Sequence, residues 1–487
     1  MSPGELLAPA LLGAHLGLAL LASGHALLYK RDPRAAWSWI LSCALLPFFG
    51  VLLYWWFGIN RIERRARREL GAPEPPAGIE PEDLMPVLPG AAPEDLVEHL
   101  RLGRALSGGR ALRAGNRVAV LHNGEQAYPA MLAAIAGARQ RVWLMSYLFD
   151  AGVVGRRFAE ALAAAVARGV EVRVLLDGVG DIVRGTRGSA LLRHHGVPVR
   201  LFLPPRLWPP LLHVNLRNHR KLLCVDGQLA YLGGINIGDH HLLAGWPGLL
   251  PGASAARMTA TDLHFQIEGP VCRQLAEVYA EDWQASGGEP LALPATEPPP
   301  PASSGQASCR VITDGPNTEV GRLQLLMLGA LANARRRVRI MTPYFIPTPE
   351  LSGALQSAAM RGVAVEILIP ERGDNPWLDA ATRRWLGQLL HHRVRVWRRP
   401  APFAHAKLFL VDEHYALIGS ANLDPRSLRL NFELMLEVYD QALLANLHQH
   451  YGAVAAGSPE LSEAELLARP LGRRLRDSLW WLLSPYL

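Results

Sequence analysis

Two segments of the chain contain the same reactive residue types at the same spacing. In each, a histidine is followed two residues later by a lysine and seven residues later by an aspartate, and six further residues lead to Gly-Gly-x-Asn or Gly-Ser-x-Asn. A chance repeat of five residue types at fixed spacing is improbable, which indicates a duplicated site. The repeated positions are His219, Lys221, Asp226, Gly234 and Asn236 in the first segment and His405, Lys407, Asp412, Ser420 and Asn422 in the second.

These residue types suit transfer at a phosphodiester. Residues two apart on a strand point to the same face, so each histidine and its lysine project together. A phosphodiester is a poor, anionic electrophile that needs a nucleophile, an acid for the leaving alkoxide, and cations or donors around its other oxygens. Two His, two Lys and two Asn supply that set without a metal or other cofactor, and neither segment has the clustered ligands of a two-metal site. We expect His219 and His405 to face each other across the scissile phosphate.

The lysine content supports a special role for the repeat. Of the 50 Lys and Arg residues, only Lys30, Lys221 and Lys407 are lysine. Because the chain uses arginine wherever either cation would serve, the two lysines kept in the repeat indicate that the compact ammonium group itself is needed.

The two aspartates of the repeat have a different expected role. An Asp seven residues from a His on a strand points to the opposite face. We therefore predict that Asp226 and Asp412 fix a loop by hydrogen bonding or ion pairing and support the site without reacting.

The regions around the two segments also repeat each other. An Ala-rich helical pattern precedes a strand in each half, and Arg168 to Leu175 aligns with Arg361 to Leu368 as a helix end followed by an apolar strand. Strands that alternate with helices predict an α/β fold in each half. The predicted organisation is an N-terminal pair of transmembrane helices over 1–60, a basic and Pro-rich linker over 61–95, a first half over 96–286, a Pro-rich linker over 287–308 and a second half over 309–487.

The N-terminal region predicts a membrane anchor. Residues 6–29 and 35–58 contain no Asp, Glu, Lys or Arg, and each stretch exceeds the roughly 20 residues that cross a bilayer core. We expect a transmembrane helical hairpin; a buried helix pair, or one span with a re-entrant segment, is the alternative. The cluster of Arg61, Arg64, Arg65, Arg67 and Arg68 after the second stretch favours cytoplasmic catalytic domains, although the connection over 30–34 is also basic.

Charge and cysteine content add weaker limits. The formal net charge of +7 and the pI of about 9.4 favour anionic partners, either a lipid surface or nucleic acid, without choosing between them. The four cysteines have no metal-ligand spacing, so we expect neither a disulfide nor a structural zinc site.

The duplicated motif resembles the HKD motif of the phospholipase D superfamily, and with the N-terminal hairpin the chain is similar to bacterial cardiolipin synthases. The likeness covers nearly the whole chain, including the Thr-Pro-Tyr-Phe-Ile-Pro run over 342–347. It implies two tandem phospholipase D-like α/β domains related by pseudo-twofold symmetry. It also implies a phosphatidyl-histidine intermediate, with His219 and His405 as nucleophile and general acid/base in an order that the sequence does not assign. Lys221, Lys407, Asn236 and Asn422 would hold the phosphate.

Each histidine also needs a carboxylate to orient its far ring nitrogen. Glu433 is the candidate in the second half, and the family pattern suggests Asp262 at the corresponding place in the first half. A surface salt bridge is the alternative for either carboxylate.

The resemblance implies transfer between two phosphatidylglycerol molecules, giving cardiolipin and glycerol, at the bacterial cytoplasmic (inner) membrane in a multi-pass protein. The alternatives are hydrolysis of a phospholipid head group, a membrane-tethered nuclease and a non-catalytic scaffold. A tethered site favours lipid over nucleic acid, so phosphatidylglycerol is the expected partner and nucleic acid is not; the oligomeric state stays open. The C-terminal stretch from Arg473 to Tyr486 is typical of an interfacial helix or a docked one, and apolar loops over 207–212 and 245–251 are candidate lipid contacts.

Overall fold

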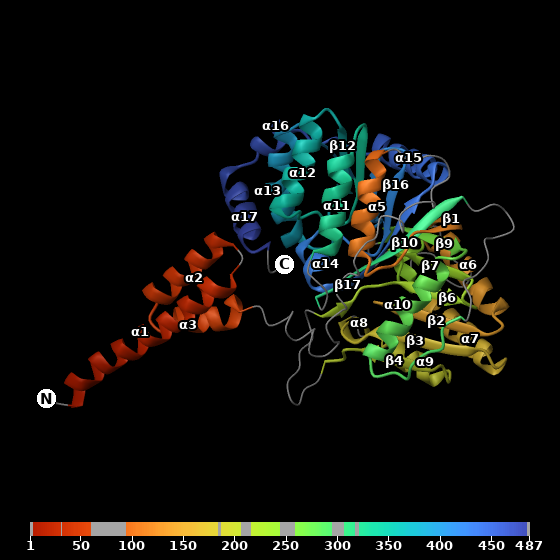
Figure 1. Cartoon of the computed structure of the whole chain (residues 1–487), viewed down its shortest axis with the longest axis horizontal. Helices are drawn as coiled ribbons and strands as arrows, with labels where there is room; N and C mark the ends of the chain where they lie inside the picture. Colours follow the sequence, from red (N-terminus) through yellow and green to blue (C-terminus); the bar gives the residue numbers. More distant parts are fainter. Residues whose placement is uncertain are drawn as a thin grey trace. The chain divides into compact units, whose positions relative to one another are not determined.

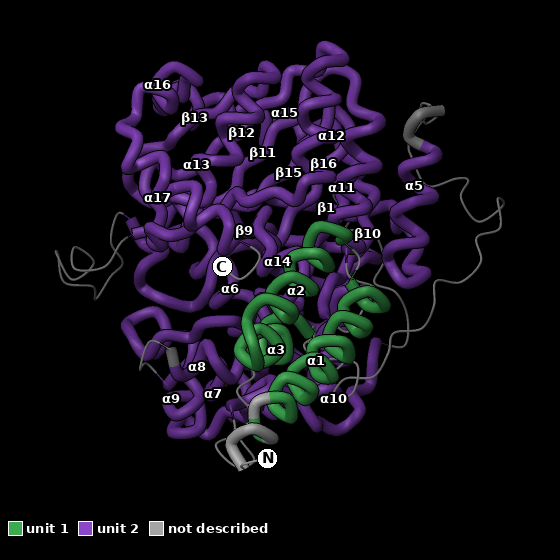
Figure 2. The backbone as a smooth tube through the Cα atoms, turned by 90° about the vertical axis from the view of Figure 1, so that its left-hand side faces the viewer, with its two compact units in different colours: residues 1–68 green, residues 69–487 purple. Residues whose placement is uncertain are grey.

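The computed structural model describes residues 3–30, 32–59, 94–183, 187–205, 216–243, 259–294, 306–316 and 321–484. The chain forms two compact units, residues 1–68 and 69–487, which Figure 2 colours separately. Several predictions fall outside the described residues. These concern the basic cluster over 61–68, most of the first linker, half of the second, and the two apolar loops over 207–212 and 245–251.

The first unit contains one long apolar helix. Helix α1 (Pro3–Tyr29) has 27 residues, which at about 1.5 Å each gives a length near 40 Å, more than the roughly 30 Å of a bilayer core. Its stretch Pro9–Tyr29 is the one described segment that is long and apolar enough to cross a membrane.

The second apolar segment is divided into shorter helices, so the described residues support the predicted hairpin only in part. Helix α2 (Pro33–Leu45) ends before Leu46, and a short helix α3 (Phe49–Leu53) continues into a π-helical turn η1 (Tyr54–Gly58). Pro47 explains the break, because proline lacks an N–H, clashes with the preceding turn and pushes the residue before it into extended backbone. Leu46 has that extended conformation.

After the break, the chain turns back along α1. Close to the break, the Phe48 N–H donates to Nδ1 of His15 at 3.3 Å. Further on, the hydroxyl of Tyr54 lies 2.7 Å from Nδ1 of His25, which is near the C-terminal end of α1. The segment therefore runs from the level of Tyr29 to that of His15 and returns, as a re-entrant element does.

The second unit is built on one continuous sheet with helices on its faces (Figure 1). The strand order is β13-β12-β11-β15-β16-β17-β10-β1-β9-β7-β6-β2-β3-β4. The two halves meet at the seam between β10 and β1. Counted outward from this seam, corresponding strands follow in the same order on both sides, so the predicted α/β fold of two halves with pseudo-twofold symmetry is confirmed. At the seam the strands are antiparallel, with Arg113 opposite Cys309 and Asn116 opposite Ala307.

The strands of the two halves correspond in order, except that β17 of the second half takes the place of both β8 and β9 of the first. Those of the first half are β1 (Arg113–His122), β2 (Arg141–Ser146), β3 (Glu171–Asp177), β4 (Val199–Phe202), β5 (Arg217–Asn218), β6 (Leu222–Val225), β7 (Leu229–Gly233), β8 (Ala260–Thr261) and β9 (Leu263–Glu268). Those of the second half are β10 (Ala307–Asp314), β11 (Arg337–Met341), β12 (Ala364–Pro370), β13 (Arg395–Arg399), β14 (Phe403–Ala404), β15 (Leu408–Val411), β16 (Tyr415–Gly419) and β17 (Asn431–Tyr439).

The helices bury their apolar sides against this sheet and give each half its own core. In the first half, for example, α7 buries Phe158, Leu162 and Ala165. The helices of this region are α5 (Glu94–Leu106), α6 (Asn123–Gly137), α7 (Val153–Ala167), α8 (Gly180–Val183), α9 (Gly188–His194), the 3-10 turn η3 (Asp239–His241) and α10 (Cys272–Ala285). Those of the second half are α11 (Arg322–Asn333), α12 (Pro349–Met360), α13 (Pro376–His391), α14 (Pro425–Arg429), α15 (Gln441–Ala456), α16 (Glu463–Leu467) and α17 (Leu471–Leu482).

Helix α5 begins the first half in the sequence but packs on the core of the second. Leu100 belongs to that core, and its carbonyl accepts a hydrogen bond from the buried guanidinium of Arg310 at 3.1 Å. Gly103 is needed at this contact, because a Cβ would overlap the Arg310 side chain. The two halves are therefore tied together by α5 as well as by the sheet.

All four cysteines are buried free thiols.

Candidate active site

Two short strands that precede the histidines are exchanged between the halves. Strand β5 leaves the first half and pairs in parallel with β17 of the second, and β14 pairs in the same way with β8 of the first. The backbone N–H of His219 donates to the carbonyl of Phe432 at 2.9 Å, and that of His405 donates to the carbonyl of Thr261 at 2.8 Å. Each histidine is thus held by the backbone of the opposite half.

The carboxylates that orient the histidines are exchanged as well. Nδ1 of His219 lies 3.1 Å from both carboxylate oxygens of Glu433, and Nδ1 of His405 lies 2.6 Å from a carboxylate oxygen of Asp262. The sequence-based pairing of each carboxylate with the histidine of its own half is therefore wrong, although the two residues are the ones predicted. The physical reason is the strand exchange, which moves each histidine beside the last strand of the other half.

The Gly/Ser position of the repeat supports these carboxylates in two different ways. The Ser420 hydroxyl donates to Glu433 at 2.5 Å, and Asn431 donates to the other oxygen at 3.1 Å. At the equivalent place in the first half, a Cβ on Gly234 would overlap the Asp262 carboxylate. A hydroxyl therefore holds one carboxylate, and the absence of a side chain leaves room for the other.

The ring contacts define how each imidazole is protonated. A carboxylate at Nδ1 favours the tautomer with hydrogen on that nitrogen and leaves Nε2 free to attack or accept a proton. Burial lowers the pKa of His219 to about 4, against the opposing charge of Glu433. Burial, together with the cations of Lys407 and Lys221, also holds the pKa of His405 well below its usual range. Before substrate binds, both rings therefore favour the neutral form.

Burial and nearby charges act in opposition on the two orienting carboxylates. Burial alone would raise the pKa of Glu433, but His219 and Lys221 hold it below its ordinary value. Burial raises the pKa of Asp262 to about 6, although Lys407 opposes the rise. Glu433 is therefore firmly ionised at neutral pH, and Asp262 less so.

The two lysines reach back over their histidines. Nζ of Lys221 donates to the His219 carbonyl at 2.7 Å and lies 5.5 Å from the centre of the Tyr147 ring. Nζ of Lys407 donates to the His405 carbonyl and lies 3.0 and 3.1 Å from the two ring nitrogens. The Lys407 ammonium is thus beside the imidazole of His405, and the Lys221 ammonium is held by the backbone of His219. Both lysines are almost completely buried.

This packing predicts that arginine does not replace either lysine. The larger planar guanidinium of Lys221→Arg or Lys407→Arg would not fit where a compact ammonium is enclosed, and losing one such donor typically lowers turnover by about 10²- to 10³-fold. We expect a loss of that size in kcat/KM on a short-chain phospholipid. Lys30→Arg, at the third lysine of the chain, is the matched control and should keep full activity; an active Lys407→Arg enzyme would contradict the requirement.

The lysines also predict a loss of activity on the alkaline side. Burial lowers the pKa of Lys221 to about 7 and that of Lys407 to about 8. As pH rises through this window, the free enzyme loses the positive charge that attracts phosphate, so kcat/KM should fall. A bound phosphate raises both pKa values, so kcat at saturating substrate should fall only at higher pH. Initial rates over the neutral range test this, and a kcat/KM that climbs steadily from pH 7 to pH 9 would contradict it.

The asparagines of the repeat lie in the same buried region. The Leu148 N–H donates to the side-chain oxygen of Asn236 at 3.2 Å, which leaves the amide NH₂ available as a donor. The side-chain oxygen of Asn422 is buried and has no hydrogen-bond partner among the described residues. Both amides thus retain hydrogen-bonding capacity for a ligand.

The two aspartates of the repeat are structural in their contacts. Asp226 and Asp412 have φ of +52° and +49°, in the left-handed region that suits a tight turn. Each carboxylate accepts hydrogen bonds from three consecutive backbone N–H groups, those of residues 139–141 for Asp226 and 335–337 for Asp412. They hold the turn after the HxK strand against the start of β2 or β11.

Three further residues at the site were not predicted from the sequence. The Tyr147 ring lies 5.2 Å from that of His219, Asp177 accepts from the Asn218 N–H at 2.7 Å, and Nε2 of His241 lies 3.2 Å from the Asn236 N–H. Tyr147 recurs as Tyr344 in the second half, which was a usable signal. Asp177 stands at the end of a buried strand, which was a weaker signal. Nothing in the sequence distinguished His241.

Comparison with known proteins agrees with this geometry. The family described as "cardiolipin synthase, PLD-like domain" matches residues 131–244 and 327–454, and an N-terminal family described as "phospholipase D-nuclease N-terminal" matches residues 17–58. Cardiolipin synthase A of Pseudomonas putida (strain F1) is 33% identical over 98% of both chains. The major cardiolipin synthase ClsA of Bacillus subtilis is 30% identical over 94% of this chain and 95% of its own. The chain belongs to the cardiolipin synthase family.

Membership of the cardiolipin synthases makes the protein a phosphotransferase of phospholipid metabolism that works in a membrane context. A solved structure, the phosphatidylserine synthase of Haemophilus influenzae Rd KW20, superimposes with a TM-score of 0.58 at 15% identity. It covers 80% of this chain and all of its own, and it supports the fold alone.

Proposed function

We propose that this cardiolipin synthase transfers the phosphatidyl group of one phosphatidylglycerol to the head-group hydroxyl of a second, giving cardiolipin and glycerol. The observation that carries the proposal is the pair of histidines, each oriented by a buried carboxylate from the opposite half. The curated relatives that match nearly the whole chain support the choice of product.

In the first step, Nε2 of one histidine attacks phosphorus and a P–N bond forms as the bond to glycerol breaks. The other histidine, which is protonated at Nε2 once the anionic phosphate is bound, gives this proton to the leaving alkoxide and becomes neutral. In the second step, that same histidine removes a proton from the incoming hydroxyl, whose oxygen attacks phosphorus and restores the free imidazole. Lys221, Lys407, Asn236 and Asn422 neutralise and bind the non-bridging oxygens, and Glu433 and Asp262 stabilise the imidazolium that each step creates.

Transfer to a lipid hydroxyl requires that water is kept from the intermediate. The side chains of His219 and His405 are 12% and 15% exposed, and those of Glu433 and Asp262 are completely covered. This enclosure supports transfer over hydrolysis, and no feature of the site specifically supports a nuclease.

The decisive experiment is to incubate detergent-purified protein with phosphatidylglycerol as the only lipid and to resolve the products by mass spectrometry. We expect cardiolipin and an equal amount of glycerol. Phosphatidic acid as the main product would replace the proposal with hydrolysis, and an absence of any product would exclude phosphatidylglycerol as donor.

We also expect the reaction to be insensitive to chelators. The Lys407 ammonium is about 3 Å from both ring nitrogens of His405, and a cation held there opposes the binding of a metal ion. EDTA should therefore leave the initial rate unchanged within error. Inhibition by EDTA that is reversed by adding back a divalent metal would overturn the metal-independent mechanism.

We further propose that the protein lies in the cytoplasmic membrane of a bacterium, crossed by α1, with α2 to η1 as a re-entrant segment and the catalytic unit in the cytoplasm. An uninterrupted hairpin would put the basic residues over 30–34 and those over 61–68 on opposite sides of the membrane. A re-entrant segment puts both on one side, as the positive-inside rule favours. Labelling single cysteines placed near residues 32 and 64 in intact cells tests this: equal protection from an impermeant reagent supports it, and labelling of one alone contradicts it.

A further inference from the structure

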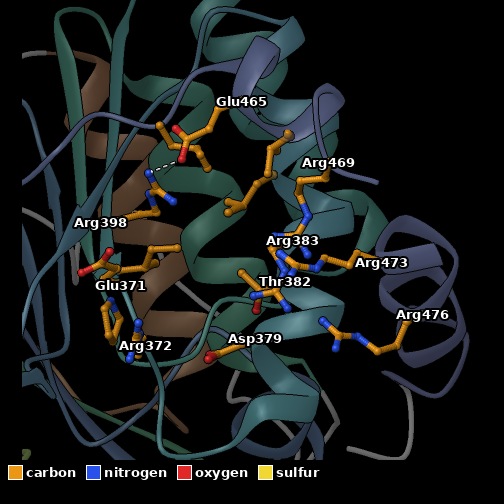
Figure 3. Close-up of a pocket in the computed structure, with 15 residues that line it drawn as sticks. Glu371, Arg372, Asp379, Thr382, Arg383, Arg398, Glu465, Arg469, Arg473 and Arg476 are labelled. Atoms are coloured by element: carbon orange, nitrogen blue, oxygen red, sulfur yellow. Dashed lines mark hydrogen bonds and ion pairs between the residues drawn. The ribbon is translucent and has the colours of Figure 1, made fainter. Parts of the chain in front are cut away.

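A second site lies at the outer end of the second half, where α17 packs on α13. An open cavity of about 530 Å³ is lined by the end of β12, by β13 and by α13, α16 and α17 (Figure 3). None of its lining residues belongs to the duplicated motif or contacts the paired histidines. Its arginines are Arg372, Arg383, Arg398, Arg469, Arg473 and Arg476, and its carboxylates are Glu371, Asp379 and Glu465.

The arginines are only partly neutralised. Arg383, Arg469 and Arg476 share a single carboxylate, that of the buried Asp477, at 3.1, 2.8 and 3.5 Å. In Figure 3 the side chains of Arg383, Arg469 and Arg473 converge in the middle of the cavity. Arg473 and Arg372 have no ion-pair partner among the described residues. Guanidinium groups gathered in this way repel one another unless an anion lies between them.

Two of the guanidinium groups also have a buried N–H without a partner. Arg398 is paired with Glu465 at 2.6 Å through one Nη, but its Nε has no hydrogen-bond partner. Nε of Arg469 is buried and unpaired in the same way. Buried donors are normally satisfied, so these two indicate an acceptor that fills the cavity. A phosphate fits, because it offers several oxygens to forked donors.

The surface beside the cavity is suited to a bilayer. Four leucines of α17 lie along one side of the helix and are each more than half exposed: Leu471, Leu475, Leu479 and Leu482. On the neighbouring side of the helix, Trp480 packs at a tilt against Trp377 of α13 with ring centroids 4.1 Å apart. Both line a smaller hollow that shares Asp379, Arg383 and Arg476 with the cavity. An apolar stripe, interfacial tryptophans and basic residues together are typical of a helix in the membrane surface.

We propose that this cavity binds the phosphate head group of an anionic phospholipid while α17 lies in the membrane surface, as a site separate from the catalytic one. The tryptophan pair is placed where the glycerol backbone would pass from cavity to bilayer, and the leucine stripe is in contact with acyl chains. The site positions the catalytic unit against anionic regions of the membrane.

The test measures hydrogen exchange of residues 467–484 in the full chain, reconstituted in phosphatidylcholine nanodiscs with and without phosphatidylserine. We expect exchange of α17 to slow at least about threefold with the anionic lipid, since one bound head group at a few times its Kd shifts the equilibrium by that order. The double variant Arg372→Gln/Arg473→Gln removes two cavity cations without breaking an ion pair, and it should lose the slowing. Arg474→Gln, on the same helix but outside the cavity, is the matched control and should keep it.

Three results would overturn the proposal. Equal protection in pure phosphatidylcholine would make the contact independent of the head group. Protection that persists in Arg372→Gln/Arg473→Gln would show that the cavity is not involved. Protection reproduced in phosphatidylcholine discs by inorganic phosphate alone would make this a soluble-anion site. Turnover on a short-chain substrate should be normal in both variants, which verifies that they are folded.

Discussion

Replacing either His219 or His405 by alanine should abolish cardiolipin formation, with kcat reduced by at least about 10⁴-fold, because the members of such a catalytic group act as one unit. Each variant removes either the nucleophile or the acid and base that serve it, and no other described imidazole is oriented by Asp262 or Glu433. Product formation from phosphatidylglycerol, followed by mass spectrometry, measures the loss. His391→Ala, on the exposed face of α13, is the control and should be fully active.

The same two variants identify the nucleophile. With an activated phosphatidyl donor whose leaving group needs no proton, the variant that lacks only the general acid should still form the covalent adduct on its remaining histidine. Peptide mapping then locates the phosphatidyl group at residue 219 or 405. Rapid cardiolipin synthesis by either alanine variant would show that one histidine suffices, which would exclude the paired mechanism.

Glu433→Gln and Asp262→Asn should each reduce kcat by about 10²- to 10⁴-fold, since a neutral amide can neither stabilise the imidazolium nor fix its tautomer. The loss from Glu433→Gln should be the larger, because burial raises the pKa of Asp262 to about 6 and keeps this carboxylate closer to neutrality in the free enzyme. Glu268→Gln, at a partly exposed carboxylate of the same sheet, is the control. Losses below tenfold in both site variants would contradict the orienting role.

The crossed arrangement can be tested separately from catalysis by thermal unfolding. In double-mutant cycles, His219→Ala should couple to Glu433→Gln, and His405→Ala to Asp262→Asn, by about 0.5–3 kcal/mol, as contacting residues do. The pairs within one half, His219 with Asp262 and His405 with Glu433, should be additive. Coupling within each half and additivity across the halves would mean that the exchange is wrong.

The duplicated fold was predictable because its signals are local. In each half, the His-x-Lys spacing, the apolar strands and the helix ends are all visible in short runs of consecutive residues. Equal spacing in the two halves therefore predicts equal structures. The supporting role of Asp226 and Asp412 followed for the same reason, since the alternation of a strand decides which face a residue occupies.

The pairing of Glu433 with His219 was not predictable in this way, because it depends on strands β5 and β14 leaving their own halves. Each of these strands has only two residues, too few for a periodic pattern. Pro47 was a signal for the break in the second apolar segment. The prediction of a span was based on the length of the segment and its lack of charged residues, and these criteria take no account of a proline.

The exchange of β5 and β14 has a consequence for how the sequence can change over evolutionary time. Each half carries a histidine that it cannot orient and a carboxylate that orients the histidine of the other half. A substitution in one half therefore affects the function of a catalytic residue in the other. Neither half is free to drift toward a separate activity, and a lineage that lost one of them would need a second copy of the survivor to rebuild a complete centre. The two halves are therefore expected to diverge freely in their outer helices and loops and to stay alike along the strands that they exchange.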